Sequence, residues 1–400
     1  MKRKRVALVL AGGAARGAYE VGVVQYVFEN VAASLGRPLR FDIFCGTSVG
    51  ALNACGLAAW AHEGKASVAR MLDVWHALKL ETLLRTDVLS LFGALRLRST
   101  DVPPREAGVL DAKGIESVVH GSIPFERIDE NLAAGHLDAL TVSTTHVQSG
   151  RTVVFVQTAD GKLPRWSADP TIEPRIAKIR APHALASAAI PILFRSVRID
   201  GEFHCDGGLR QNVPLSPARR LGADALLVIN PRFVTDAALA PADPKKEEAF
   251  PGPLFLLGKT LNALLLDRID TDLARLESVN RILDAGARAY GERFVPTLNG
   301  ELGYAPEHGL RPLRPMLVRA SRDIGKLAAD FVRAHESTMT GLTGRIIRRL
   351  AASAGGDPNE SDLLSYILFD GRFAKELIEL GWSDARDRHD ELCDFFRALS

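Results

Sequence analysis

The chain of 400 residues has few cysteines and no long apolar run. Its cysteines show neither C-x-x-C spacing nor the density of a disulfide framework, and no cluster of His and Cys indicates zinc. No stretch approaches the roughly 18 apolar residues that a membrane-spanning helix needs. We therefore expect a cytoplasmic protein without a metal, which is either soluble or lies on a membrane surface. The cysteines are Cys45, Cys55, Cys205 and Cys393.

The chain also lacks an excess of charge of either sign. Lys and Arg number 50, and Asp and Glu number 48, which gives a formal net charge of +2. This balance provides no overall attraction to nucleic acid, and no nucleic-acid partner is expected. Hydrophobic residues make up 46% of the sequence, which is enough for a full core and excludes a disordered chain.

The N-terminal residues have the basic start of a secretion signal but not its length. The apolar run Val6 to Ala11 ends at two glycines before an h-region of normal length is reached. We interpret this run as a buried strand of a parallel sheet. The glycines lead into residues 18–34, whose apolar positions recur at helical spacing.

The glycine loop at Gly12 and Gly13 has the layout of an anion-binding site. A strand, a glycine loop and a helix in this order direct backbone N–H groups at an anion over the helix N-terminus. A dinucleotide is one candidate, but the spacing is not G-x-G-x-x-G and no acidic residue is placed to bind a ribose. The other candidate, which we favour, is the oxyanion of an acyl-transfer reaction.

A serine that could generate such an oxyanion lies in Gly46-Thr47-Ser48-Val49-Gly50. An apolar run precedes this pentapeptide and a small-residue helix follows it, so the chain must reverse direction within a few residues. Such a turn is a nucleophile elbow, which lifts the hydroxyl of Ser48 to a helix N-terminus. The alternative is an ordinary loop, because G-x-S-x-G arises readily by chance in a chain with 34 glycines.

A serine hydroxyl needs a neighbouring base to become a good nucleophile. Of the ten histidines, His183 and His204 are nearest to the candidate chemistry, but no histidine lies in a loop typical of a triad. Asp206 is the alternative base, since it leaves a predicted strand and the following Gly207 and Gly208 allow close backbone approach. The same Asp-Gly pair is also common in ordinary turns.

The remaining segments indicate further elements and one boundary. Residues 81–123 form either a lid over the site or an ordinary surface excursion. Residues 172–189 are predicted to form a helix. Residues 236–253, rich in Ala, Pro and charge, form the predicted linker, and residues 254–400 a mostly helical extension. The stretch 250–266 is a candidate membrane contact, with a core-packing helix as the alternative.

Three motifs occur in order along the chain: G-G-A-A-R-G after the first strand, G-T-S-V-G after the second apolar run, and D-G-G much later. Together they resemble the patatin-like phospholipases. The resemblance also covers A-S-A-A-I-P at residues 186–191 and extends into the C-terminal part. It implies a three-layer α/β/α sandwich with a mainly parallel sheet over residues 1–235.

The resemblance also implies roles for individual residues. Ser48 is the nucleophile, Asp206 is its base in a Ser-Asp dyad, and the amides of Gly12, Gly13 and Ala14 form the oxyanion hole. The family often has a third glycine where this chain has Ala14, so the hole is retained if the backbone there needs no positive φ. Supporting residues are Arg16, Gly46, Gly50, Gly207 and Gly208. Arg16 either neutralises developing charge or anchors the loop.

The activity that the resemblance implies is that of a serine esterase acting on lipids. It would hydrolyse the acyl ester of a phospholipid, lysophospholipid or neutral lipid through an acyl-enzyme, without a cofactor. A lipid substrate and a peripheral membrane contact are the expected partners. Three alternatives stay open: an acyltransferase that uses the same serine, a non-catalytic lipid-binding protein, and a nucleotide-binding protein.

Overall fold

The computed structural model describes most of the chain in eleven stretches. These are residues 3–80, 113–164, 166, 169–191, 193–234, 269–304, 309–339, 344–345, 347–348, 351 and 358–399. The predicted linker, the candidate membrane contact and residues 81–112 of the candidate lid lie outside them. No helix within these stretches is long and apolar enough to cross a membrane.

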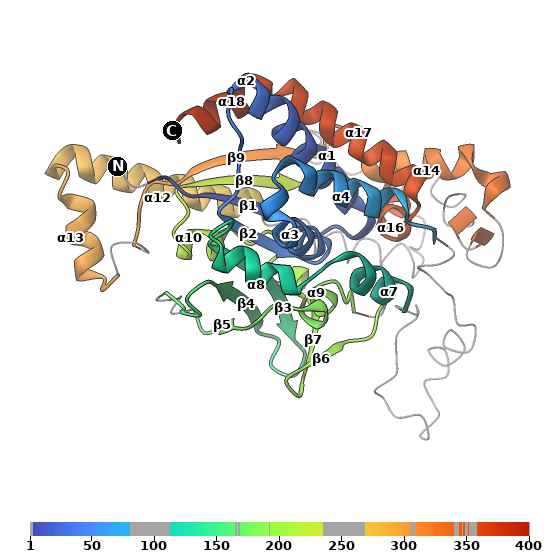
Figure 1. The fold of residues 1–400 in the computed structure, drawn as a ribbon, viewed down its shortest axis with the longest axis horizontal. Coiled ribbons are helices and arrows are strands. Elements are labelled where there is room, and N and C mark those ends of the chain that lie inside the picture. The colour runs from blue at the N-terminus through green and yellow to red at the C-terminus, as the bar shows by residue number, and fades with distance from the viewer. Residues whose placement is uncertain are drawn as a thin grey trace, which may run out of the picture.

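A nine-stranded sheet forms the centre of the molecule (Figure 1). Five adjacent strands run parallel: β3 (Ala139–His146), β2 (Ile43–Thr47), β1 (Val6–Leu10), β8 (Ala225–Asn230) and β9 (Arg314–Arg319). Beyond β3, β4 (Thr152–Thr158) is antiparallel to β3, and β5 (Ile172–Ile176) forms the edge. The hairpin of β6 (Val197–Ile199) and β7 (Glu202–Asp206) joins through β7, which is antiparallel to β3. Both β3–β4 and β6–β7 are thus pairs of consecutive antiparallel strands.

The two faces of the sheet are both covered, as the uninterrupted apolar sequence of β1 requires. Successive side chains of a strand point to opposite faces, so Leu8 and Leu10 belong to one core cluster, and Ala7 and Val9 to another. The first cluster is covered by α1 (Gly17–Tyr26), α3 (Val49–Ala59), α4 (Lys65–His76), α7 (Lys113–Ser122), α8 (Glu126–Ala133), α9 (Ala181–Ser187), α14 (Ile324–Ala334), α16 (Pro358–Ile367), α17 (Gly371–Asp387) and α18 (His389–Arg397). The second is covered by α10 (Leu215–Arg220) and α12 (Ile269–Tyr290). The predicted three-layer α/β/α class is thus confirmed.

The helix predicted over residues 172–189 is wrong. Residues 172–176 form β5, and the helix α9 begins only at Ala181. Two prolines explain the difference. Pro174 lacks an N–H and is tolerated in β5 because an edge strand needs hydrogen bonds on one side only. Pro182 lies in the first turn of α9, where a backbone N–H has no partner within the helix.

Helix α17, near the C-terminal end of the chain, packs against the N-terminal helix α1 (Figure 1). A Cβ atom on Gly22 of α1 would lie 2.0 Å from the carbonyl oxygen of Ile378 in α17, and one on Gly381 would lie 2.1 Å from that of Tyr19. The Tyr19 hydroxyl donates a hydrogen bond to Asp384 over 2.9 Å. The close contact between α1 and α17 therefore depends on glycine at both positions.

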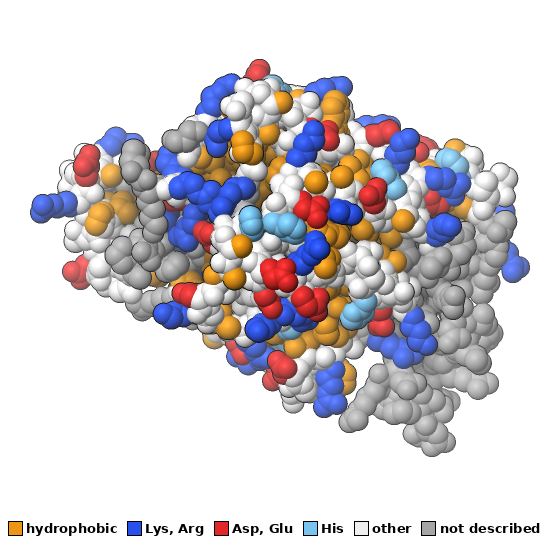
Figure 2. Space-filling model, in the orientation of Figure 1, with side chains coloured by type: hydrophobic (Ala, Val, Ile, Leu, Met, Phe, Trp, Pro, Cys, Tyr) orange, Lys and Arg blue, Asp and Glu red, His pale blue; other side chains and the backbone are white. Residues whose placement is uncertain are grey.

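Lys and Arg side chains are interspersed with Asp and Glu on the described surface seen in Figure 2. The arrangement agrees with the balanced composition of the sequence. On this face, attraction to a charged partner would have to come from a local group of residues.

Substitution of Gly22 tests the packing of α17 on α1. We expect Gly22→Ala to lower the free energy of unfolding by about 1–3 kcal/mol, because the added methyl group collides with the backbone of α17. Gly121→Ala is the control, since no atom lies within 4 Å of a Cβ at this helical position. It should be neutral or stabilising by up to about 1 kcal/mol. Equal effects of the two substitutions in urea denaturation would contradict the contact.

Candidate active site

Ser48 is the single residue between β2 and α3. Its backbone has φ 55° and ψ −127°, a conformation that costs a non-glycine residue on the order of 1–3 kcal/mol. The neighbouring glycines allow this turn to form. A Cβ on Gly46 would lie 2.3 Å from the carbonyl oxygen of Gly50, and one on Gly50 would lie 2.4 Å from that of Leu10. The tight turn thus depends on residues without side chains.

The Ser48 side chain directly contacts Asp206, the last residue of β7. Its Oγ donates a hydrogen bond to Asp206 Oδ2 over 2.6 Å, and the Gly208 N–H donates to Oδ1 over 2.7 Å. Ser48 is 1% exposed and Asp206 is fully buried. Burial raises the pKa of Asp206 to about 7, although the hydrogen bonds from Ser48 and Gly208 act to lower it. The carboxyl group can therefore both accept and release a proton near neutral pH.

Asp206 is held in place by β3 and the segment before β6. Its backbone N–H donates to the carbonyl oxygen of Ala189 over 2.9 Å, and Thr145 Oγ1 donates to its carbonyl oxygen over 2.9 Å. A Cβ on Gly207 would lie 2.2 Å from the carbonyl oxygen of Ser143. Gly207 is thus needed for the chain after Asp206 to pass this close to β3.

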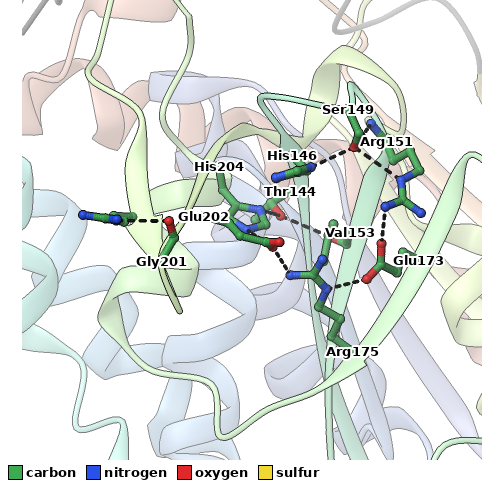
Figure 3. Close-up of polar contacts among 11 residues, drawn as sticks. Thr144, His146, Ser149, Arg151, Val153, Glu173, Arg175, Gly201, Glu202 and His204 are labelled. Carbon is green, nitrogen blue, oxygen red and sulfur yellow. Dashed lines mark hydrogen bonds and ion pairs between the residues drawn. The ribbon is translucent and has the colours of Figure 1, made fainter. Parts of the chain in front are cut away.

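Ion pairs join the β6–β7 hairpin to the edge of the sheet (Figure 3). Arg175 on β5 bonds to Glu202 at the start of β7 and, over 2.7 Å, to Glu173. Arg151 pairs with Glu173 over 3.0 Å. These side chains are partly exposed, so each pair contributes little free energy. As a set, however, they restrict the strand that ends at Asp206.

Neither histidine near the site takes part in the contact between Ser48 and Asp206. His204 bonds through Nδ1 to Thr144 Oγ1 over 3.0 Å, and burial lowers its pKa to about 4, with His146 and Arg175 acting in the same direction. His183 Nδ1 accepts a hydrogen bond from the Arg180 N–H at the start of α9, and burial lowers its pKa. Within the described part of the chain, no hydrogen bond joins either ring to Ser48 or Asp206.

The glycine loop lies against Ser48. A Cβ on Gly12 would lie 3.1 Å from the Cβ of Ser48. The N–H of Gly12 donates to the carbonyl oxygen of Asn212 over 3.2 Å, so this amide already has a partner. The amides of Gly13 and Ala14 are the remaining candidates for an oxyanion. Asn212 was not identified from the sequence, because no motif connects it with the loop.

Ala14 has φ 49°, in the left-handed region. The condition set above, that the backbone here needs no positive φ, is therefore not met. An L-residue in this region is strained by roughly 1–2 kcal/mol relative to the right-handed conformation. Ala14 nevertheless adopts this conformation, so its backbone N–H is retained in the loop at a cost in strain that a glycine would not have.

Arg16 is bound to α16 and is 3% exposed. Its Nε donates to Ser365 Oγ over 2.8 Å and its Nη2 donates to Asp362 Oδ1 over 2.8 Å. The guanidinium also lies 4.2 Å from the centre of the Tyr366 ring. Of the two roles considered for Arg16, this geometry favours the anchor of the loop. The sequence did not indicate the partners, which lie nearly 350 residues away.

Ser187 at the end of α9 orients the turn at Ser48. It accepts a hydrogen bond from the Ser48 N–H over 2.8 Å, and its Oγ donates to the carbonyl oxygen of Ser143 over 2.6 Å. The backbone amide of Ser48 is thus already bonded within the protein. Ser187 belongs to the A-S-A-A-I-P segment, but its contact with Ser48 could not be derived from that segment alone.

An apolar cavity of about 70 Å³ lies beside the turn. Val49, which follows Ser48, forms part of its wall together with side chains of α3, α4 and α7. The described residues contain no group of three or more His, Cys, Asp or Glu side chains that could hold a metal ion. The main apolar lining residues are Val49, Leu52, Met71, Val74, Trp75, Leu78, Ile115, Val118, Val119, Ile123 and Phe369.

Asp206→Asn tests the burial of the carboxyl group through protein stability. A pKa of about 7 in the folded chain, against roughly 3.9 when unfolded, means that the folded state binds more protons between these values. The stability of the parent chain therefore falls as pH rises from about 4 to 7. The variant has an uncharged amide at this position, which does not titrate, so its stability does not fall for this reason. We expect the variant's free energy of unfolding, relative to the parent, to rise by roughly 3 kcal/mol from pH 5 to pH 8.

Urea denaturation at the two pH values measures this difference. Asp73→Asn, at an exposed position of α4, is the control. Its free energy of unfolding relative to the parent should be nearly the same at the two pH values. If the free energy of unfolding of Asp206→Asn relative to the parent does not change with pH, the carboxyl group is not held in a dry site.

Two solved structures share low similarity with the chain. VipD from Legionella pneumophila is 12% identical, with a TM-score of 0.30, over 94% of this chain and 67% of that one. The complex of SpcU with ExoU from Pseudomonas aeruginosa gives 13% identity and a TM-score of 0.24, over 96% of this chain and 78% of that one. Both scores are low, and the architecture described above rests on the sheet of this chain.

Sequence comparison gives a more specific result. The cGAMP-activated phospholipase of Pseudomonas aeruginosa (strain BWHPSA011 / Pa011) is 28% identical over 214 residues, which are 52% of this chain and 53% of that protein. The chain thus matches about half the length of this curated relative. The family described as patatin-like phospholipase matches residues 8–219, a range that includes Ser48 and Asp206. Since this range is more than half of the chain, the resemblance found in the sequence is confirmed, and the protein belongs to the patatin-like phospholipase family.

Proposed function

We propose that the protein is a lipid acyl hydrolase in which Ser48 attacks an ester carbonyl and Asp206 accepts its proton. The observation that carries the proposal is the 2.6 Å hydrogen bond from Ser48 Oγ to Asp206 Oδ2 in a buried site. Family membership supports the reaction class. The name of the curated relative supports a phospholipid as the first substrate to test.

The reaction would proceed in two halves. Ser48 Oγ forms a bond to the carbonyl carbon while its proton moves to Asp206 Oδ2 and the carbonyl oxygen becomes an oxyanion. Collapse of this intermediate breaks the ester C–O bond, and the proton passes to the leaving alcohol. Water then gives a proton to Asp206 and its oxygen bonds to the acyl carbon. The bond from Ser48 Oγ to that carbon breaks, Asp206 returns the proton to Oγ, and the fatty acid leaves.

The raised pKa of Asp206 makes it a suitable base. A carboxylate with a pKa near 4 is a weak base toward a serine hydroxyl, whereas a pKa of about 7 lies near the operating pH of a general base. The Gly208 N–H occupies Oδ1 and so leaves Oδ2 to Ser48. Burial and geometry thus both favour proton transfer between these two atoms.

The amides of Gly13 and Ala14 are the proposed oxyanion donors. The Gly12 amide was part of the predicted hole, but its bond to Asn212 makes it the weakest of the three candidates. Each oxyanion donor is worth about 2.7–4 kcal/mol in the transition state. Arg16 would act indirectly, since its bonds to α16 hold the helical turn that follows these amides.

The apolar cavity beside Val49 is the proposed site of part of the acyl chain, because its volume of about 70 Å³ is below the range of about 300–1,000 Å³ that is usual for small-molecule sites. Its wall includes Val49, the residue that follows Ser48, and its lining is almost entirely apolar. Because Ser48 is 1% exposed, a reacting ester must enter the molecule, and an acyl chain can bind favourably among these apolar side chains. A contact of the whole protein with a lipid surface remains part of the proposal.

Substitution of the serine tests the proposed mechanism. We expect Ser48→Ala to lower the hydrolysis of phospholipid vesicles and of p-nitrophenyl butyrate by at least about a thousandfold, since a residual rate rests on binding and the oxyanion donors alone. A fluorophosphonate should label the parent chain at Ser48. Ser278→Ala, on α12 at the opposite face of the sheet, is the control and should keep both activities. Hydrolysis that persists in Ser48→Ala would disprove the mechanism.

The dependence of the rate on pH tests the base. Asp206 must be ionised to accept the proton, so kcat/KM should rise with pH to a plateau, with a midpoint of about 7. Asp206→Asn should reduce kcat by at least about a hundredfold at every pH. His183→Gln and His204→Gln should leave the midpoint unchanged. A midpoint that disappears in a folded histidine variant would instead favour a triad.

An acyltransferase would use the same serine and the same base. The two reactions differ only in the group that accepts the acyl chain from Ser48, water or an alcohol. Analysis of the products with and without an added acceptor alcohol separates them, because a hydrolase releases free fatty acid in both cases.

A further inference from the structure

A second cavity lies on the other face of the sheet. It has a volume of about 620 Å³ and lies between α10, α12 and the start of β5. Its apolar wall residues Val213, Leu215 and Leu313 belong to the second core cluster, whereas Val49 beside Ser48 belongs to the first. We call it the arginine cavity, because its wall includes Arg210, Arg219, Arg275 and Arg311.

Arg219 in this wall has no counterion among the residues that the structure describes. Within the same part of the chain its guanidinium makes no hydrogen bond or ion pair, and it is partly buried. Burial lowers its pKa, the adjacent Arg220 acts in the same direction, and Tyr304 in the same wall acts to raise it. By contrast, Arg275 lies 3.9 Å from Asp272, and Arg311 lies 3.4 Å from Asp224. Arg219 thus presents a positive charge with reduced hydration and no described ion partner.

A partly dehydrated guanidinium is unfavourable unless an anion pairs with it. Its planar set of donors fits the oxygens of phosphate and carboxylate groups. Among the described wall residues, four arginines face two aspartates, Asp169 and Asp272, and Asp224 pairs with Arg311 from outside the wall, which leaves one positive charge in excess. An anionic group therefore complements this wall, and a phosphate group offers three acceptor oxygens to its arginines.

The rest of the wall suits an organic group attached to the phosphate. Leu276, Val279 and Tyr304 offer apolar surface, and the volume lies within the range of about 300–1,000 Å³ that is usual for small-molecule sites. Asn280 stiffens this side, because its side chain makes hydrogen bonds of 2.6 and 2.9 Å with the backbone of Leu313. The wall is therefore held in shape without a ligand.

We propose that the arginine cavity binds an organic molecule that carries a phosphate group, with Arg219 as its ion partner. The inference goes beyond the proposed hydrolase activity and does not depend on Ser48. The cavity also touches the segment that follows Asp206. Gln211 lies in its wall, and the Gln211 carbonyl oxygen accepts a hydrogen bond from Thr47 Oγ1 over 3.0 Å.

Isothermal titration calorimetry on the full chain at 0.15 M NaCl tests the proposal. The probes are adenosine 5′-monophosphate, for a nucleotide source, and glycerol 3-phosphate, for a lipid-headgroup source, with adenosine, glycerol and inorganic phosphate as references. We expect one of the two organic phosphates to bind with a Kd below about 1 mM and at least tenfold more tightly than every reference. Failure of both to do so at concentrations up to about 10 mM would overturn the proposal.

Matched variants locate the binding. Arg219→Gln should weaken binding by about tenfold or more, because a charged hydrogen bond is lost. Arg220→Gln, on the next residue of α10 and outside the wall, should change it less than about twofold. Equal weakening by the two variants would mean a surface charge effect and would overturn the proposal.

The melting temperature separates lost binding from lost folding. Arg219→Gln removes a partly buried charge that has no described ion partner, so its melting temperature without a probe should equal or exceed that of the parent. Arg210→Gln, at a more exposed wall position, is the second variant and should weaken binding by at least about threefold. Unchanged binding in both wall variants would overturn the proposal. Because calorimetry involves no ester, the result is independent of whether the chain is a hydrolase.

Discussion

The hydrogen bond between Ser48 and Asp206 is the constraint that the rest of the structure must maintain. Both residues are unfavourable where they lie: Ser48 has a strained backbone, and Asp206 carries its carboxyl group in a dry site. Among the described residues, only the Ser48 hydroxyl and the Gly208 amide bond to that carboxyl group. The free energy that holds the pair together must therefore come from the parallel sheet and from close packing around the glycines of the turn.

The sequence predicts those parts of the site that depend on neighbouring residues. The flanks of Ser48, the strand before Gly12 and the turn after Asp206 have local signatures in apolar periodicity and glycine spacing. The contacts of Ser187 with Ser48, of Asn212 with Gly12 and of Arg16 with α16 join residues far apart in the chain, and no spacing rule predicts them. The helix expected over residues 172–189 is wrong for another reason. The apolar content of this segment does not show that Pro174 lies in an edge strand or that Pro182 lies in the first turn of a helix.

The C-terminal part of the chain contributes to the site although the family match ends at residue 219. The helix α16 binds Arg16, and α17 packs on α1, the helix that follows the glycine loop. The position of the Ala14 amide, in a strained backbone, thus depends on residues that lie outside the matched range. The glycine loop is thus anchored by helices that lie outside the range matched by the family.

Asp206 and Arg219 show the same physical principle with opposite charge. The carboxyl group of Asp206 has a raised pKa and the guanidinium of Arg219 has a lowered pKa, because both are withdrawn from water. The difference lies in their partners. Asp206 is bonded by groups of the chain itself, which fits the proposed exchange of a proton with Ser48. Arg219 has no such partner among the described residues, and it lies in a cavity large enough for a small molecule, which fits the proposal that a bound phosphate group completes its bonding.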